Sequence, residues 1–341
     1  MQRNNTIDIA RGIGMLGIMM LHMQLVITYP WGASAVPLFF VISGYLMKPI
    51  ANKRSYTKNR LKRLLIPYGF TSLMMLLCAI FSNSIFPSDR SNGTVILEWI
   101  YAAVYGAGDP YTEPFYIKSI GGIWFLLATL WAALFMQWII DRKWGWQIIC
   151  VSVLFLTGVA TSALFWFPFS IQAGMCSTVY MYIGYLAKEG LPWLQKQSKA
   201  VKGGFLLISI TACVAFYRFF EAFWLVHCEF AHGIFDIIGS LGAVVCYLMI
   251  SAVLSRHCNL LGKALAVIGK YSIVILCVHI IELEAFPWGE VVNALIAHGV
   301  SEYMASAVWL RVFKIVWTAA ATVFCIYCPI TRKIFGIKKA R

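Results

Sequence analysis

The sequence predicts an all-α, polytopic integral membrane protein with about ten transmembrane helices and both termini in the cytoplasm. Of its 341 residues, 60% are hydrophobic and only 12% are charged, whereas a soluble globular chain carries about 25% charged residues. Apolar runs of about 20 residues, the length that a helix needs to cross a bilayer, recur along the whole chain. These two observations favour a bundle of membrane helices, and no segment suits a soluble domain, so we expect one transmembrane domain over residues 1–341.

The expected spans follow one another with short connections, and their ends are approximate to within a few residues. We expect the first to stay in the membrane rather than to be cleaved as a signal peptide, because it carries Asp8 and Arg11 and lacks a small-residue cleavage site. The ten spans are residues 7–29, 33–50, 64–86, 120–140, 146–164, 170–187, 203–220, 233–254, 268–286 and 305–328.

Positive charge is concentrated on alternate connections between these spans. Seven of the 28 Lys and Arg residues lie in 48–63, four in 188–202, three in 256–270 and five in 331–341, all on one predicted side of the membrane. Cytoplasmic connections carry the excess of Lys and Arg, so this side is predicted to be cytoplasmic. The basic cytoplasmic connections account for the net charge of +14, so this charge does not require nucleic acid as a partner, and we expect none.

The longest connection, residues 87–119, is predicted to lie outside. Its apolar and aromatic part, Val95–Tyr105, suits an interfacial or re-entrant segment. Trp residues near the expected span ends fit an interfacial belt.

Three ionisable residues on one face of the first span are the strongest functional signal. Eleven helical steps of about 100° separate Arg11 from His22, so their side chains share one stripe about 16 Å long, and Asp8 falls on the same face. Ionisable side chains inside a membrane span are costly and usually functional. The His22 imidazole suits proton transfer, Arg11 suits an anionic group, and Asp8 suits pairing with Arg11. The alternatives are a packing histidine and a snorkelling arginine.

Other motifs are less specific. Gly12, Gly14 and Gly17 match the dinucleotide pattern GxGxxG, but that pattern needs a βαβ unit, so we expect these glycines to serve helix packing. Arg60 and Arg63 suit a phosphate clamp, although positive charge on the cytoplasmic side alone also explains them.

Two further polar groups lie near the predicted outer ends of later spans. His279, Glu282 and Glu284 form a polar cluster in the ninth expected span. His279 and Glu282 are one helical turn apart, so a His–Glu pair is feasible, structural or in contact with substrate. His227 and His232 lie near carboxylates in an outer connection, where solvated histidines are more common than metal ligands. Among ten Cys, one C-x2-C spacing falls inside an apolar span with no second pair, so we expect no metal.

Five short motifs follow one another along the first 279 residues. They are Asp8-Ile-Ala-Arg11-Gly12 with the later His22, Val36 to Leu46, Arg60 to Tyr68, Gly122 to Leu126, and Lys270 to His279. In order and spacing they resemble the integral-membrane acyltransferase-3 family of bacteria, in the short form without a soluble domain. Pro37 departs from the family pattern, which often has an acidic residue near this position.

The resemblance implies a membrane O-acyltransferase, most simply an O-acetyltransferase of the bacterial cytoplasmic membrane. Its donor would be acetyl-CoA or another acyl-CoA, and its acceptor a hydroxyl of a cell-surface or exported glycan or a lipid-linked saccharide. It implies that His22 is catalytic, that Arg11 supports it or the donor, and that Arg60 and Arg63 help to bind coenzyme A. From the stripe itself we expect Asp8 to hold Arg11 in this catalytic group, and Arg11 to share in binding coenzyme A. Candidates for substrate binding are Ser43, Tyr45, Trp124, His279 and Glu282.

A competing interpretation is a secondary transporter or flippase of a lipid-linked glycan or small solute. Buried charges serve such proteins as well. An inverted repeat would favour a transporter, and the sequence shows no clear one.

Overall fold

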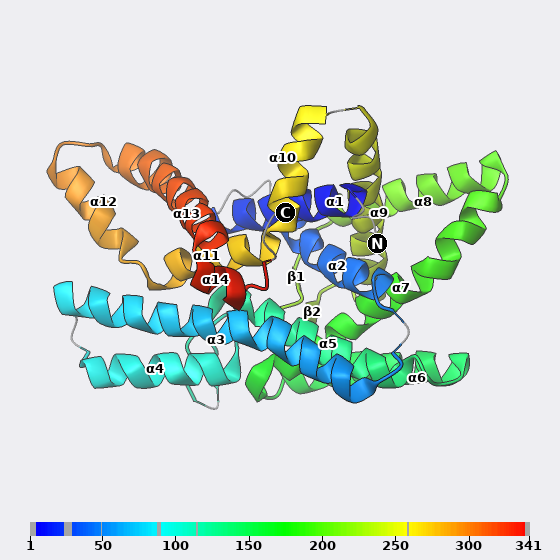
Figure 1. Ribbon diagram of the computed structural model, residues 1–341, viewed down its shortest axis with the longest axis horizontal. Helices are drawn as coiled ribbons and strands as arrows, with labels where there is room; N and C mark the ends of the chain where they lie inside the picture. The colour runs from blue at the N-terminus through cyan, green and yellow to red at the C-terminus, as the bar shows by residue number, and fades with distance from the viewer. Residues whose placement is uncertain are drawn as a thin grey trace. The chain divides into compact units, whose positions relative to one another are not determined.

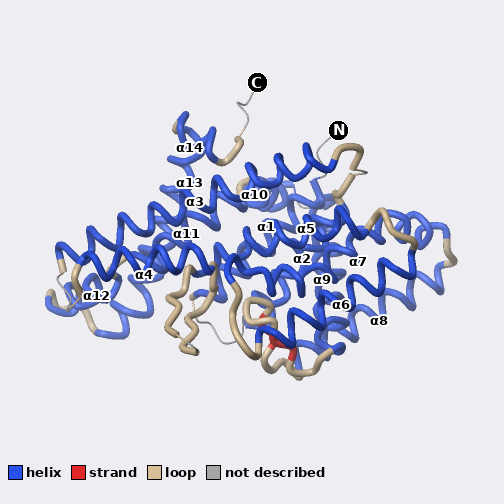
Figure 2. The backbone as a smooth tube through the Cα atoms, turned by 90° about the horizontal axis from the view of Figure 1, so that it is seen from below, coloured by secondary structure: helices blue, strands red, loops and turns tan. Residues whose placement is uncertain are grey.

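Most of the described chain is helical, which confirms the all-α prediction. The computed structural model describes residues 5–23, 29–48, 50–86, 90–113, 115–257 and 259–337. The regular strands among them are one short hairpin, and helices account for the rest of the regular structure (Figure 1; Figure 2).

Six of these helices are long and apolar enough to cross a membrane, and seven if α10 and α11 together form one span. Large apolar side chains on them are exposed, among them Leu73 and Phe81 of α3, which suits contact with lipid. The predicted total of about ten spans and the cytoplasmic position of both termini stay predictions.

The chain divides into two compact units, each described here by itself. The first unit comprises Met1–Thr57, Ala128–Phe165 and Ile171–Ser272. Its elements are α1 (Asn5–His22), α2 (Tyr29–Tyr45), α6 (Trp144–Ser162), α7 (Ile171–Lys196), α8 (Lys199–Arg218), β1 (Phe223–Trp224), β2 (Glu229–Phe230), α9 (Ile234–His257) and α10 (Asn259–Lys270).

Helices of the first unit approach one another closely at glycines. A Cβ atom added to Gly44 of α2 would lie 1.8 Å from the Met181 carbonyl oxygen of α7, and one added to Gly184 would lie 2.0 Å from the Val41 carbonyl oxygen of α2. Both distances are far below van der Waals contact, so α2 and α7 can cross this closely only because each presents hydrogen in place of a side chain.

The second unit comprises Lys58–Leu127, Trp166–Ser170 and Ile273–Arg341. Figure 1 shows α3 and α4 lying side by side, and the Tyr68 hydroxyl of α3 donates a 2.7 Å hydrogen bond to the Ala103 carbonyl of α4. The elements of this unit are most of α3 (Lys53–Ile85), α4 (Asn92–Tyr105), η2 (Gly121–Ile123), η3 (Pro168–Ser170), α11 (Ser272–Ala285), α12 (Trp288–Ala297), η4 (Met304–Trp309), α13 (Leu310–Tyr327) and α14 (Pro329–Ile334), while α5 (Trp124–Ile139) contributes to both units.

The basic segment expected as a connection over 48–63 is instead largely helical, because α3 begins at Lys53. Lys and Arg are good helix formers, and neither Gly nor Pro interrupts the segment before Pro67. The Lys53 ammonium holds this first turn in place, 2.6 Å from the Asp141 carboxylate and 4.0 Å from the centre of the Trp138 ring.

The structure also differs from the expected elements near α10, α11 and α12. The single span expected over 268–286 is two helices, since α10 ends at Lys270 and α11 begins at Ser272. Much of the connection expected over 256–270 is therefore helical, with Leu265 turned inward and Leu260 exposed. Helix α12, which falls between the last two expected spans, was not expected, because its ten residues are too few to read as a membrane span.

Close packing at Gly184 gives a direct test of the α2–α7 crossing. We expect Gly184→Ala to lower the free energy of unfolding by about 1–3 kcal/mol, because the new methyl group overlaps the Val41 carbonyl. Gly190→Ala on the same helix meets no atom within 4 Å, so it should leave stability unchanged or raise it by up to about 1 kcal/mol. Denaturant unfolding of both purified variants in detergent measures the difference, and equal stability would contradict the crossing.

Candidate active site

The three ionisable residues of the first helix lie on one continuous α-helix, as their spacing predicts. Helix α1 runs unbroken from Asn5 to His22. Asp8 lies in its first turn and is buried, Arg11 is half-buried, and His22 is the last helical residue and is also half-buried. The rise of about 1.5 Å per residue places the Arg11 and His22 Cα atoms about 16 Å apart along the axis. The helix therefore presents a cation near one end and an imidazole at the other.

Helix α10 packs directly on the part of α1 that carries Asp8 and Arg11. A Cβ atom on Gly12 would lie 2.1 Å from the Leu265 carbonyl oxygen, and one on Gly269 would lie 1.8 Å from the Asp8 carbonyl oxygen. The two backbones thus touch on either side of Arg11 in the sequence, which fixes the rotation of α1 about its own axis. The direction in which the stripe faces follows from this contact.

The glycines of the GxGxxG pattern serve helix packing, as expected. Added Cβ atoms on Gly14 and Gly17 would lie 3.0 Å from the Leu38 side chain and 2.9 Å from the Trp31 ring nitrogen, both in α2. A strand is absent near this pattern in the part of α1 and α2 that the structure describes. The dinucleotide interpretation is therefore excluded on structural grounds.

A cluster of hydroxyl groups lies beside the residues that pack against the last turns of α1. Ser34 of α2 lies 3.1 Å from the hydroxyl of Tyr217 and 3.1 Å from that of Tyr247, and Tyr247 donates a 2.7 Å bond to the Trp31 carbonyl. Trp31 contacts α1 at Gly17, so the cluster supports the His22 end of the helix. The sequence did not reveal it, because these residues are far apart in the chain and form no motif.

Ser43 and Tyr45 lie at the end of α2 in the same unit. The Ser43 hydroxyl donates a 2.8 Å hydrogen bond to the Phe39 carbonyl, and Tyr45 is the last residue of the helix and half-buried. The first unit therefore holds five of the predicted site residues: Asp8, Arg11, His22, Ser43 and Tyr45.

The predicted phosphate clamp lies in the second unit, on the third turn of α3. Arg60 is half-buried and Arg63 is exposed, and the two guanidinium groups are close enough to repel each other. Two cations held one turn apart can together bind a dianionic phosphate, which would relieve that repulsion. Trp124, at the start of α5, is buried and meets the Phe125 ring edge to face at 6.3 Å.

His279 and Glu282 form the predicted pair, at the centre of α11. The His279 Nδ1 atom lies 2.8 Å from the Glu282 carboxylate, and the two side chains are 2% and 0% exposed. The Trp288 indole donates to the Glu282 carboxylate at 2.8 Å and to the Glu282 carbonyl at 2.7 Å. This arrangement binds the start of α12 to the end of α11 and surrounds both ionisable groups with protein.

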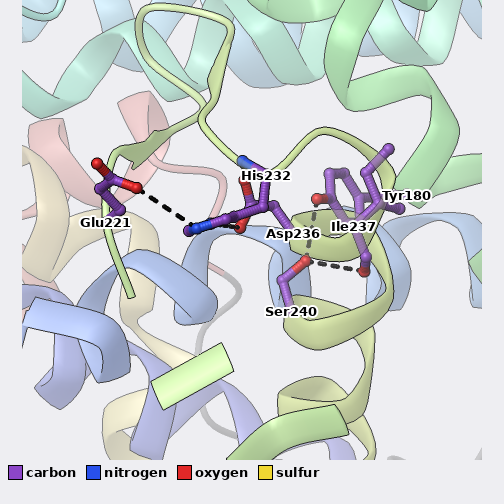
Figure 3. A network of polar contacts seen from close by, with 6 residues as sticks. All are labelled: Tyr180, Glu221, His232, Asp236, Ile237 and Ser240. Carbon is purple, nitrogen blue, oxygen red and sulfur yellow. Dashed lines mark hydrogen bonds and ion pairs between the residues drawn. The ribbon is translucent and has the colours of Figure 1, made fainter. Parts of the chain in front are cut away.

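A second histidine network joins the hairpin region to α9 (Figure 3), where the sequence placed His232 near carboxylates and favoured solvated histidines. The His232 ring lies between two carboxylates, with Nε2 3.4 Å from Glu221 and Nδ1 3.4 Å from Asp236. The Asp236 carboxylate also accepts a 2.7 Å bond from the His232 backbone N–H, and Tyr180 lies 3.0 Å from Ser240 one turn further along α9. The spacing of four residues between His232 and Asp236 is the signal that could have revealed it.

No group of three His, Cys, Asp or Glu side chains that could hold a metal ion occurs within the described ranges.

Comparison with protein families gives one match over almost the whole chain. The acyltransferase-3 model, described as an acyltransferase domain, matches residues 4–331 and spans both compact units. Neither the curated proteins nor the solved structures give a match.

The buried pair in α11 predicts a large difference between two glutamate variants. Glu282→Ala leaves the Trp288 indole without its carboxylate acceptor and the buried His279 ring without the carboxylate that faces it, so we expect a loss of about 1–3 kcal/mol in the free energy of unfolding. Glu290→Ala, an exposed position on α12, should change it by no more than about 0.5 kcal/mol. Chemical denaturation followed by tryptophan fluorescence compares the two, and a similar small loss in both would show that the pair contributes little.

Proposed function

The chain belongs to the acyltransferase-3 family of membrane acyltransferases, and on that premise we propose that it is an O-acyltransferase acting on a glycan. The donor is acyl-CoA from the cytoplasm, most simply acetyl-CoA, and the acceptor is a hydroxyl of a cell-surface or exported glycan or of a lipid-linked saccharide. The observation that carries the proposal is the family match together with the charged stripe on the unbroken helix α1.

His22 is proposed to act as the general base. It takes the proton of the acceptor hydroxyl while that oxygen attacks the thioester carbonyl carbon. The new C–O bond forms, the C–S bond breaks, and the proton passes from the imidazolium to the departing coenzyme A thiolate. The position of His22 at the C-terminal end of α1 supports this role, since the negative end of the helix dipole stabilises an imidazolium.

Alternatively, His22 takes the acyl group itself before passing it to the acceptor. Both routes need the imidazole at the same place, so the stripe supports them equally.

Arg11 and Asp8 are proposed to position the donor. A guanidinium on the buried face of α1 can bind a phosphate or polarise the thioester carbonyl, and Asp8 one turn earlier orients it. The contact of α10 on both sides of Arg11 supports this, because a fixed helix holds its side chains in a fixed direction.

Arg60 and Arg63 are proposed to bind the coenzyme A phosphates. Planar guanidinium groups bind phosphate oxygens in pairs, and the mutual repulsion of these two favours an anion between them. Their place on the basic part of α3 suits the cytoplasmic side, where acyl-CoA is found.

Ser43, Tyr45 and Trp124 are proposed to contact the substrates, as the family resemblance implies. The His279–Glu282 pair is proposed to serve the substrate site by holding the end of α11, since both side chains are enclosed by protein. The protein is proposed to reside in the bacterial cytoplasmic membrane, with the lipid bilayer as a partner of its exposed apolar helices.

His22→Ala is expected to lower the rate of acyl transfer at least about 100-fold, because general-base catalysis contributes roughly that factor or more. The measurement is release of coenzyme A thiol by the purified protein, together with the mass increase of the acylated glycan. His257→Ala, at the exposed end of α9, is the matched control and should retain full activity. Wild-type rates in His22→Ala would contradict the assignment.

The double variant Arg60→Gln/Arg63→Gln is expected to weaken acetyl-CoA binding at least about tenfold, since each charge-assisted hydrogen bond contributes about 1.5–3 kcal/mol. Arg54→Gln/Lys58→Gln removes two positive charges from the exposed start of the same helix, so it controls for net charge. Isothermal titration with acetyl-CoA measures both. The clamp is wrong if the two double variants bind equally.

A further inference from the structure

A polar pocket of about 380 Å³ lies within the second unit and was not recognised from the sequence. The ends of α3 and α11, helix α4 and the segment before η2 form its walls. The polar side chains that determine its chemistry are Asn83, Arg90, Glu98, Lys118 and Glu284.

Of the two pairs of oppositely charged side chains in the wall, one forms an ion pair and the other does not. The Arg90 guanidinium lies 2.9 Å from the Glu98 carboxylate. In contrast, no hydrogen bond or ion pair from the residues that the structure describes reaches the Glu284 carboxylate or the Lys118 ammonium. Lys118 instead lies 4.9 Å above the centre of the Trp99 ring and attracts Glu284 electrostatically. An acceptor and a donor therefore remain available to a ligand.

The position of Glu284 is set by Gly121. This glycine has φ of +65°, and a Cβ atom there would lie 2.6 Å from the Glu284 carboxylate oxygen. The absence of a side chain at this position lets the Glu284 carboxylate, which lines the pocket, lie against the backbone of Gly121. Any other residue at this position would displace the Glu284 carboxylate, and the positive φ independently favours glycine.

The lining favours a neutral ligand rich in hydroxyl groups. Two basic and two acidic side chains line the pocket, and Asp109 and Lys314 lie near Glu284. A charged ligand would face at least one group of its own sign, whereas a neutral polyol donates hydroxyl protons to the carboxylates and accepts from the cations.

Three aromatic side chains, Phe86, Trp99 and Phe286, also line the pocket. Phe86 is exposed, and Phe286 stacks on Trp288 at 5.6 Å. The volume lies within the range of about 300–1,000 Å³ that small-molecule sites occupy.

From these contacts we propose that the pocket binds a sugar unit of the saccharide acceptor through Glu284 and Lys118. This inference rests on the proposed O-acyltransferase function, and it names the acceptor as a neutral saccharide. The pocket adjoins the connection 87–119, which is predicted to face outward, and an exported glycan is found on that side.

The test uses purified full-length protein in nanodiscs and an array of immobilised bacterial polysaccharide fragments. Wild-type protein should bind at least one neutral fragment, and Glu284→Gln and Lys118→Met should each weaken that binding at least tenfold. Glu290→Gln, on the exposed surface of α12, is the control and should bind as wild type does. Thermal unfolding of each variant checks the fold, and Lys118→Met tests the pocket by itself if Glu284→Gln is unstable.

The proposal is overturned if wild-type protein binds no fragment, or if both pocket variants bind as wild type does. Binding to vesicles of anionic phospholipid is measured in parallel. The proposal is also overturned if Lys118→Met weakens only the binding to these vesicles. Failure of the proposed function gives a different result, since wild-type protein would then bind the fragment without consuming acetyl-CoA. His22→Ala should keep saccharide binding while losing transfer, which separates the two sites.

Discussion

Direct contact between helix backbones at glycine is the constraint on which the first unit depends. Helices in lipid gain little from hydrophobic burial, because the lipid tails are as apolar as the side chains, so close van der Waals contact has to hold them together. Gly12 and Gly269 allow this contact between α1 and α10, and Gly44 and Gly184 allow it between α2 and α7. The first crossing includes the backbone of Asp8, so the packing that stabilises the unit also determines where the ionisable side chains of α1 face.

The sequence predicts well what depends on local periodicity. Apolar runs gave the helices, and the angle between Arg11 and His22 on α1 followed from the helix repeat alone. The sequence predicts poorly where helices begin or break. The start of α3 at Lys53 and the interruption between α10 and α11 at Tyr271 do not follow from hydropathy. The pocket could not be predicted at all, since Arg90 and Glu284 meet only through tertiary packing.

Two glutamates near the end of α11 differ in their surroundings: one has partners within the protein, and the other remains available to a ligand. Glu282 is fully enclosed; the Trp288 indole donates to one of its carboxylate oxygens, and the His279 ring lies 2.8 Å from the other. Glu284, two residues later, lines the pocket and receives no hydrogen bond from the residues that the structure describes. Leaving a partly buried carboxylate without such a bond costs free energy, and binding sites often contain groups of this kind. Sequence position cannot distinguish the two, because both lie in the same apolar run.

Under the proposed function, the bilayer itself explains why polar groups are needed at separate places. The phosphates of coenzyme A and the hydroxyls of a saccharide both lose hydration on entering hydrocarbon, so neither substrate can cross by itself. An acetyl group is small and mostly apolar, and it is the only part that has to pass between them. The arginine pair on α3, the stripe on α1 that ends at His22 and the polar pocket at Glu284 would then each bind a different part of the substrates. The helix that carries His22 would supply the single reactive group that both substrates must reach.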